Sequence, residues 1–287
     1  MEKYCDFHTH SNASDGSDTP AGLMAKAADA GLGTVALTDH DTVAGLDEAE
    51  REAERQGIGF IPGVELSVIH DQGNMHMLCY LMDRNDRAFR AVLARLQEAR
   101  GLRNERMLAS LEEVGKPLSM DELEALAGDG QVGRPHFARA MVQRGYVSSV
   151  SEAFELYLKR GAPAYVPKSI LSAEDAIKVI HDAGGIAVLA HPCSLRTASI
   201  DALEEIIARL ARQGLDGVEC HYSEHGKTFT EKCVGIANKY GLVITGGSDY
   251  HGKAKPHIGL GRGKGNLRVP CSCANAIMAR KHERKGG

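Results

Sequence analysis

Short apolar runs alternate with longer amphipathic runs along most of the chain. The apolar runs predict strands, and the amphipathic runs with a 3.6-residue period predict helices. We expect strands at residues 3–7, 34–40, 58–69, 74–82, 186–192, 216–220 and 242–249. We expect helices between them at residues 19–32, 42–57, 172–185, 200–214 and 229–241. Such alternation indicates a mostly parallel sheet with helices outside it, and six or seven units favour a barrel over an open sheet.

Local signals support several of these boundaries. Thr19 suits the N-cap of the first helix, and Pro20 suits its first position. Gly57 is expected to end the second helix. A polar turn, "HDQG" at residues 70–73, is expected to join the third and fourth strands.

The alternation stops between about residue 100 and residue 165, where only helical patterns occur. These helices are expected at residues 119–128, 133–145 and 149–161, and Ser119 with Glu122 forms a capping-box pattern. We therefore divide the chain into a first barrel part at 1–99, a small inserted helical subdomain at 100–165 and a second barrel part at 166–287. The last residues, rich in Gly, Lys and Arg, are expected to be a solvated tail.

The composition narrows the class of protein. The 287 residues are 43% hydrophobic and 25% charged, which is enough to form one core without disulfides. A net charge of −4 argues against a generally basic nucleic-acid binder. The seven cysteines form no CxxC pair, and the N-terminus has no apolar signal segment, so we expect a cytoplasmic protein. No apolar run of about 18 residues is present, so no membrane span is expected.

Side chains of the kind that bind metals stand at the ends of the expected strands or in the following loops. In a β/α barrel these ends meet at one face, so residues that are distant in sequence would converge there. Glu65 would be costly to bury in an apolar run without a cation. The expected ligands are His8, His10, Asp15, His40, Glu65, His76, His191, Asp249 and His251.

This set favours a cluster of ions over a single one. Six imidazoles and three carboxylates exceed the needs of one tetrahedral ion, so we expect two or three divalent ions. Nitrogen and oxygen ligands suit manganese, which we expect first, and also zinc or iron(II).

The motifs resemble those of the PHP (polymerase and histidinol phosphatase) family within the amidohydrolase-like superfamily. The matching segments are "DFHTHSNASDG", "LTDHDT", "GVELS", "HML", "LAHP" and "GGSDYHG". The resemblance implies a distorted (β/α)7 TIM-like barrel with up to three metals. It implies one ion held by His8, His10, Glu65 and Asp249, a second by Glu65, His76 and His191, and a third by Asp15, His40 and His251.

The order of the segments and the place of the insertion resemble one branch of the family in particular. That branch contains 3',5'-nucleoside bisphosphate phosphatases and short-RNA 5'→3' exonucleases. We therefore expect removal of the 3'-phosphate from a pAp-like nucleotide by a hydroxide that bridges two metals, at a site built by Glu65, His191 and Asp249. His225 is a candidate proton donor to the leaving oxygen.

A bisphosphate needs a second anion site, and the inserted helices are expected to roof it. Arg134 can hold phosphate bidentately at a helix start, with His136 beside it. The further candidates for substrate contacts are Lys168, His221 and Ser223.

Three other functions stay open at this point. An exoribonuclease on short RNA would use the same metal site, although 5% aromatic residues and no Trp limit base stacking. A histidinol-phosphate phosphatase or a non-catalytic metal-binding module of the same family are the others. The expected partners are an AMP- or pAp-like nucleotide, phosphate and, for the exoribonuclease, short RNA, with no membrane and no obligate protein partner.

Overall fold

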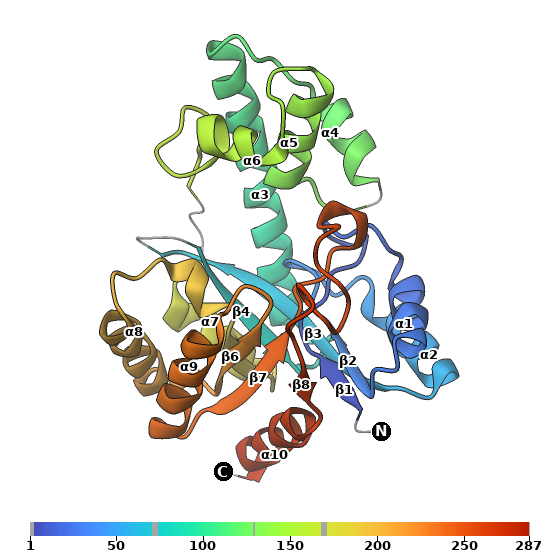
Figure 1. Cartoon of the computed structure of the whole chain (residues 1–287), viewed down its shortest axis with the longest axis vertical. Helices are drawn as coiled ribbons and strands as arrows, with labels where there is room; N and C mark the ends of the chain where they lie inside the picture. The colour runs from blue at the N-terminus through green and yellow to red at the C-terminus, as the bar shows by residue number, and fades with distance from the viewer. Residues whose placement is uncertain (1–2, 71–73, 129, 168–170, 287) are drawn as a thin grey trace.

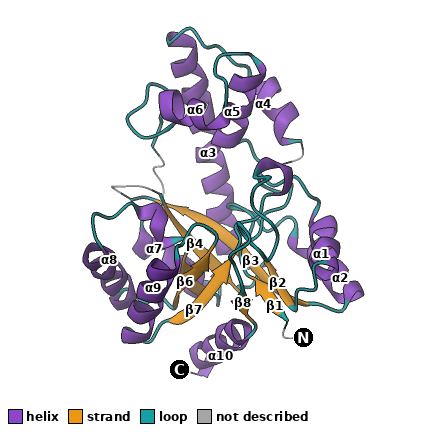
Figure 2. Cartoon of the chain, viewed as in Figure 1, coloured by secondary structure: helices purple, strands orange, loops and turns teal. Residues whose placement is uncertain are grey.

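Eight strands form one sheet at the centre of the computed structural model, which describes residues 3–70, 74–128, 130–167 and 171–286 (Figures 1 and 2). The order across the sheet is β7-β6-β5-β4-β3-β2-β1-β8. The strands are β1 (Tyr4–Asp6), β2 (Thr34–Leu37), β3 (Gly59–Val68), β4 (Met75–Tyr80), β5 (Ile186–Leu189), β6 (Gly217–Tyr222), β7 (Val243–Gly247) and β8 (Val269–Pro270).

The sheet curls into a nearly closed barrel, because hydrogen bonds join the end of β1 to the end of β7. The amide of Phe7 donates to the Gly246 carbonyl at 3.1 Å, and the amide of Asp249 donates to the His8 carbonyl at 2.8 Å. A Cβ atom at Gly247 would lie 2.3 Å from the Cβ of His8, so only glycine permits this approach. The ends of β1 and β7 are thereby held together at the barrel mouth.

Most strand pairs are parallel, as the β/α alternation predicts. Two strands are exceptions: the short β8 runs antiparallel to β1, and β4 runs antiparallel to both β3 and β5. It follows β3 directly, and an antiparallel pair needs no helical crossover. The turn predicted at "HDQG" falls largely on residues 71–73, which lie outside the described residues.

Helices surround the barrel and also form a separate group above it in Figure 1. The α-helices are α1 (Pro20–Asp29), α2 (Leu46–Gln56), α3 (Arg87–Glu113), α4 (Met120–Ala127), α5 (Arg134–Gln143), α6 (Val150–Ala153), α7 (Ala173–Asp182), α8 (Ile200–Arg212), α9 (Lys227–Lys239) and α10 (Ser272–Gly286). The short helices are η1 (Phe154–Leu158), η2 (Pro192–Leu195) and η3 (Gly252–Ala254). Within the described residues, no helix is both long and apolar enough to cross a bilayer.

The predicted helix signals are confirmed. Thr19 caps α1 through the amide of Gly22, and Pro20 opens the helix. Gly57 closes α2 with a left-handed φ of 67°. Ser119 and Glu122 make the reciprocal bonds of a capping box at the start of α4.

Two sequence predictions need correction. The second helix begins at Leu46, not Thr42, because Asp41 has a left-handed φ of 53° and its side chain binds Ser67. The basic C-terminal residues form the helix α10 rather than a solvated tail. Its Ile277 and Cys273 are buried with barrel residues such as Phe7 and Leu78, so an apolar face holds the helix against the bottom of the barrel.

The inserted helices have a hydrophobic core of their own. Met107 and Leu111 near the end of α3 pack with Leu123 of α4 and with Phe137 and Met141 of α5. The helix α3 itself starts in the barrel region and runs up into this group (Figure 1). The distorted barrel with an inserted helical unit is the fold that the sequence pattern and the resemblance predict, and the boundaries at 100 and 165 stay a prediction.

Candidate metal centre

All nine predicted ligands lie close together at the barrel mouth. They come from the ends of β1, β2, β5 and β7, from the hairpin of β3 and β4, and from the loop after β1. Groups of their nitrogen and oxygen atoms lie within 4.8 Å of one another. These groups are His10–Asp15–His40–His251, His8–Glu65–His191, His8–His10–Asp249 and His40–Glu65–His76.

The register of the hairpin brings Glu65 and His76 to the same face. Glu65 pairs with Leu78, and Ser67 pairs with His76, so Glu65 and His76 are diagonal neighbours. Side chains alternate along a strand, which places both of them on one side of the sheet. Their Oε1 and Nδ1 atoms are 2.6 Å apart.

Glu65 has a central place because its two oxygens face different histidines. Oε1 lies 2.6 Å from His76 and 3.0 Å from His191. Oε2 lies 2.9 Å from Nδ1 of His40 and 3.4 Å from Nε2 of His8. Such a carboxylate is placed to bridge two cations.

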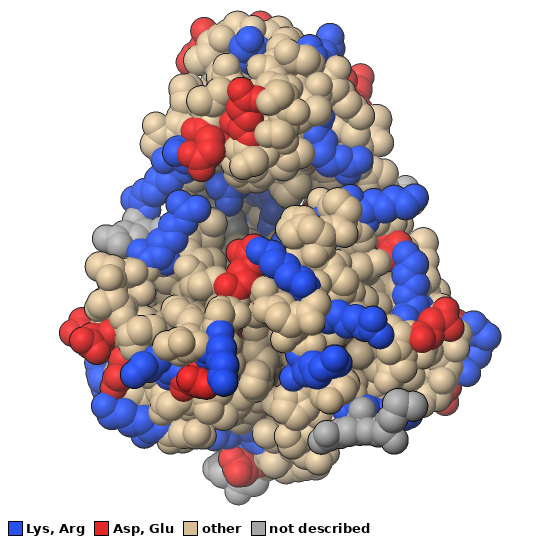
Figure 3. All heavy atoms as spheres, in the orientation of Figure 1, with Lys and Arg blue, Asp and Glu red and all other residues tan. Residues whose placement is uncertain are grey.

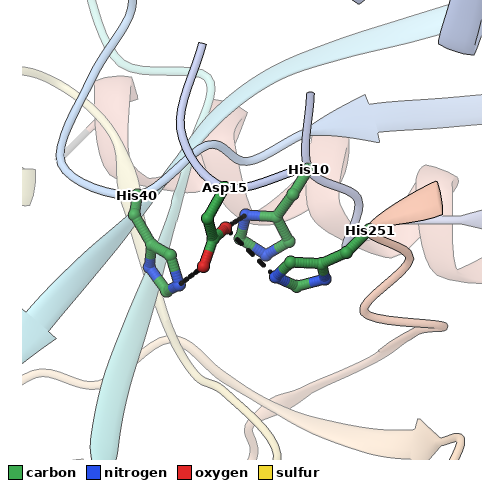
Figure 4. Close-up of side chains that lie close together, drawn as sticks. All are labelled: His10, Asp15, His40 and His251. Atoms are coloured by element: carbon green, nitrogen blue, oxygen red, sulfur yellow. Dashed lines mark ion pairs between the residues drawn. The ribbon is translucent and has the colours of Figure 1, made fainter. Parts of the chain in front are cut away.

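Asp15 forms the centre of a second group, which Figure 4 shows with His10, His40 and His251 around it. Its Oδ1 lies 3.1 Å from Nε2 of His251 and 3.8 Å from Nδ1 of His10. Its Oδ2 lies 3.8 Å from Nε2 of His40. The three rings converge on one carboxylate from separate strands.

The donor atoms fit divalent cations. Among the described residues, several of these atoms are buried and make no hydrogen bond, namely Nε2 of His8, both ring nitrogens of His10, Oδ1 of Asp15 and Nδ1 of His40. Buried polar atoms usually find a partner, and a bound cation would supply one. The nitrogen and oxygen donors suit zinc, manganese or iron.

The electrostatics of the metal-free cluster point the same way. Burial opposes the charge of Glu65, but His76 and His40 outweigh burial and lower its pKa well below the usual range. Burial also opposes protonation of His40, yet Glu65 and Asp15 raise its pKa. The carboxylates therefore need positive charge nearby, whether from protons or from cations.

Comparison with known proteins identifies the family. The PHP domain family matches residues 6–162. The chain belongs to the PHP domain family.

Two relatives show how far the PHP likeness extends. A 5'-3' exoribonuclease, Rnm, of Escherichia coli is 36% identical over 259 residues, covering 90% of this chain and 88% of the relative. A 3',5'-nucleoside bisphosphate phosphatase of Chromobacterium violaceum is 36% identical over 247 residues, covering 86% of each chain. The first relative is named for cleaving RNA, and the second is named for removing phosphate from a nucleoside bisphosphate.

A solved structure agrees with the PHP barrel. It is a protein of Bifidobacterium adolescentis described as a candidate metal-dependent phosphoesterase, with a TM-score of 0.85 and 31% identity. The match covers 97% of this chain and 96% of that one. With the family and the clustered ligands, it identifies this PHP protein as a metal-dependent hydrolase of the phosphoesterase kind.

Glu219 supports the PHP metal centre and was missed from the sequence. This fully buried residue of β6 accepts a hydrogen bond from Nδ1 of His8 at 3.0 Å and one from the amide of His191 at 2.6 Å. Donation from Nδ1 leaves Nε2 of His8 free to bind a metal. The signal was present, because "DGVEC" places a carboxylate in an apolar strand just as "GVELS" does.

Asp249 is held by two further residues that sequence reasoning did not assign to the site. Its Oδ2 accepts from the Tyr222 hydroxyl at 3.0 Å and from Nζ of Lys255 at 2.7 Å. Its Oδ1 lies 3.3 Å from Nε2 of His10. Asp249 also has a left-handed φ of 57°, and His191 has a φ of 26°. Such strain is found where the surroundings fix a functional side chain.

The predicted substrate residues of the insertion differ in how they are placed. The Arg134 guanidinium donates to Oδ1 of Asn74 at 3.2 Å and lies 5.8 Å from the centre of the Phe154 ring. His136 is buried and accepts the Gly133 amide at 3.0 Å, so its Nδ1 caps α5. Burial lowers the pKa of both Arg134 and His136.

The remaining substrate candidates lie on β6, in the loop after it, or outside the description. The Ser223 hydroxyl donates to the Ser248 carbonyl at 2.7 Å, which gives it a structural task. Nδ1 of His225 donates to the Cys220 carbonyl at 2.9 Å, and its ring centre lies 5.2 Å from that of Tyr222. His221 is half-buried, and burial lowers its pKa. Lys168 lies outside the described residues.

Proposed function

We propose that this phosphoesterase removes the 3'-phosphate from 3',5'-bisphosphorylated nucleosides such as pAp. The observation that carries the proposal is a cationic pocket beside the metal centre, separate from the ligand cluster itself. A monophosphate would need only the cations at the mouth, whereas a bisphosphate needs a second place for negative charge. The likeness to a bisphosphate phosphatase supports the same substrate class.

The pocket has a volume of about 480 Å³ and lies between the barrel and the inserted helices. Its lining includes Arg103 of α3, Arg134 of α5, Arg160, Asn74 and Tyr165. Figure 3 shows Lys and Arg side chains gathered around the hollow at this level of the molecule. A 5'-phosphate with its ribose fits such a site, and Tyr165 offers an aromatic face to the base.

Arg103 makes the pocket ready for an anion. It is 7% exposed, and its Nε donates to the Val166 carbonyl at 2.8 Å. No ion pair between Arg103 or Arg134 and a carboxylate occurs within the described chain. Burial, together with the nearby Arg134, lowers the pKa of Arg103 to about 9. Burial and mutual repulsion therefore disfavour the positive charges of these arginines, and a bound phosphate would offset that unfavourable free energy.

A short series of contacts joins the pocket to the metal centre. Arg134 binds the side chain of Asn74, and the Asn74 carbonyl accepts from the Ser194 hydroxyl at 2.8 Å. The same hydroxyl accepts from Nδ1 of His191 at 2.7 Å. Nε2 of His191 then faces Glu65. The two anion sites are therefore separated by only a few side chains, the scale of a nucleotide.

The chain's own residues mainly position the substrate. Divalent cations, when bound, lower the pKa of a coordinated water and neutralise charge on phosphate. Arg134 and Arg103 would orient the 5'-phosphate, which aims the 3'-phosphate at the ligand cluster. His225 is one ring removed from His191, through Tyr222, and we keep it as the candidate donor to the leaving oxygen.

Replacing a central ligand tests the catalytic site. We expect His191→Ala or Asp249→Ala to lower turnover of pAp at least about 100-fold, because each loses a predicted direct metal ligand. Steady-state kinetics on purified variants with measured metal content provide the measurement. Near-normal turnover by a folded variant would remove these residues from the mechanism.

Replacing Arg134 tests the substrate class separately. We expect Arg134→Ala to raise KM for pAp by roughly 10- to 100-fold, the worth of a charged hydrogen bond, while 3'-AMP turnover stays the same. Arg144→Ala is the matched control, since this exposed arginine at the end of the same helix pairs with Glu122. Equal losses on pAp and 3'-AMP would contradict a role in holding the 5'-phosphate.

The second candidate is 5'→3' exoribonuclease activity on short RNA with the same site. The likeness to the Escherichia coli exoribonuclease favours it. A screen at fixed metal should compare pAp, AMP, histidinol phosphate and a short 5'-phosphorylated RNA. A higher kcat/KM on the RNA than on pAp would reverse the order of the two candidates.

A further inference from the structure

Two cysteines from opposite ends of the chain meet at the bottom of the barrel. Cys5 lies in β1, and Cys271 lies between β8 and α10. Their Sγ atoms are 2.6 Å apart, although 266 positions separate them in sequence. This distance lies between the length of a disulfide bond, about 2.0 Å, and the longer distance of an ordinary contact between two sulfur atoms.

The fold itself imposes this approach. β1 and β8 are antiparallel, with Cys5 opposite Val269, so Cys271 returns to the same side two residues later. On the other side, a Cβ atom at Gly33 would lie 3.1 Å from Sγ of Cys271. Sγ of Cys271 also lies 2.9 Å from the Lys3 carbonyl oxygen. The thiol of Cys271 is therefore confined between β1 and the start of β2.

The two thiols differ in access to solvent. Cys5 is fully buried, and burial, together with Cys271, raises the pKa of its thiol to about 12. Cys271 is half-buried and can be reached from the surface. In the described chain no other two sulfur atoms lie within hydrogen-bonding distance, and all seven cysteines are free. The pair thus joins one reachable thiol to one protected thiol.

We propose that Cys5 and Cys271 form a redox-sensitive pair that closes into a disulfide when a small-molecule disulfide is present. The Cys271 thiolate attacks one sulfur of the oxidant, forms a mixed disulfide and releases the first thiol. The Cys5 sulfur then attacks Sγ of Cys271 and releases the second thiol. The two cysteine protons end on the two released thiols, so the protein is oxidised by two electrons and the oxidant is reduced by two.

The consequence is a covalent link between β1 and the segment that leads from β8 into α10. β1 continues directly into His8 and His10, and α10 packs against β7 and β5. A loop of this length restricts the unfolded chain strongly, so the bond should stabilise the fold. In a reducing compartment such a bond would form only under oxidising conditions and would not be a permanent structural disulfide.

The test uses the full-length protein, reduced and then equilibrated in a series of glutathione buffers. After alkylation, non-reducing peptide mapping by mass spectrometry should find a Cys5–Cys271 peptide that has lost two hydrogens. The oxidised protein should also unfold several degrees higher than the reduced protein. Cys271→Ser should lose both effects, because this half-buried position tolerates a hydroxyl.

Cys273→Ser is the matched control, since Cys273 is two residues away and buried. It should keep the Cys5–Cys271 bond and the shift in unfolding temperature. The proposal is overturned if Cys5, alkylated after the protein is denatured, stays fully reactive at every glutathione ratio. It is equally overturned if Cys271 pairs with Cys273 or stops at the glutathione adduct.

Discussion

Glu65 and Glu219 are both carboxylates in apolar strands, yet they act at different distances from the predicted ions. Glu65 faces five imidazoles with its two oxygens, so it lies inside the ligand cluster. Glu219 touches the far side of the His8 ring and the backbone of His191, so it fixes two ligands without joining them. The sequence shows a carboxylate in an apolar strand in each case, but only the tertiary structure, which brings Glu219 of β6 to His8 and His191, shows what the charge contacts.

We expect Glu219→Gln to weaken metal binding about 10- to 100-fold, the usual effect of losing the partner of a metal-binding histidine. The amide has nearly the same size but no charge to hold the His8 ring. Competition with a chromophoric chelator measures the affinity directly and does not depend on turnover.

Asp216→Asn is the matched control for that experiment. Asp216 is also buried, and it accepts hydrogen bonds from the His181 ring and from the Ala187 amide. It lies just before β6 begins, at the end of the strand opposite the metal centre. Its variant should bind metal as the unmodified protein does. Equal weakening in both variants would mean that Glu219 acts only through general stability.

At the scale of elements, α10 shows where the sequence pattern is insufficient. "ARKHERKGG" reads as a solvated basic tail, since four of its nine residues are Lys or Arg. In the fold, Arg284 reaches the buried Asp216 at 3.2 Å, and Arg280 donates to the Gly241 carbonyl at 2.7 Å. The partners come from distant loops, so no local pattern could indicate them.

We expect Asp216→Ala to lower the free energy of unfolding by about 2–4 kcal/mol. The change leaves the Ala187 amide buried without an acceptor and frees Arg284 of α10 from its partner. Denaturant unfolding at fixed metal concentration is the measurement.

Asp182→Ala should change that free energy by less than about 1 kcal/mol, since its exposed carboxylate pairs, among the described residues, with Lys178 alone, one turn away. A similar small loss for Asp216→Ala would show that α10 is held by its apolar face alone.

At the scale of the whole molecule, the barrel mouth concentrates charge that the fold cannot neutralise by itself. In the metal-free protein, burial opposes the ionisation of Asp15, yet His251 and His40 keep its pKa well below the usual range. Burial opposes protonation of His8, yet Glu219 and Glu65 raise its pKa well above 6.5. In the metal-free state, protons on His8 and His40 therefore supply positive charge that cations would otherwise supply.

We expect metal removal to lower the unfolding temperature, and the difference to grow as pH rises above the ordinary histidine pKa of about 6.5. The raised pKa values of His8 and His40 favour their protonated forms in the metal-free fold. That stabilisation is complete below the ordinary histidine pKa and is lost as pH rises through the raised values. Cation binding instead needs neutral imidazoles and strengthens over the same range.

Thermal unfolding with saturating metal and with a chelator, at each pH, measures the difference. A difference that is constant or shrinks with rising pH would show that the histidines do not exchange protons for cations.

The amino-acid pattern alone predicts the strands and helices, the helical interruption of their alternation and the types of side chain that could bind metal. It could do so because periodicity, capping and turn chemistry are local, and because the motif segments are short and contiguous. The tertiary structure alone shows that Glu219 supports His8, that Arg103 and Arg134 share one pocket, and that Cys5 meets Cys271. These depend on contacts between residues far apart in the chain, which are set by how the barrel closes and not by any neighbouring residues.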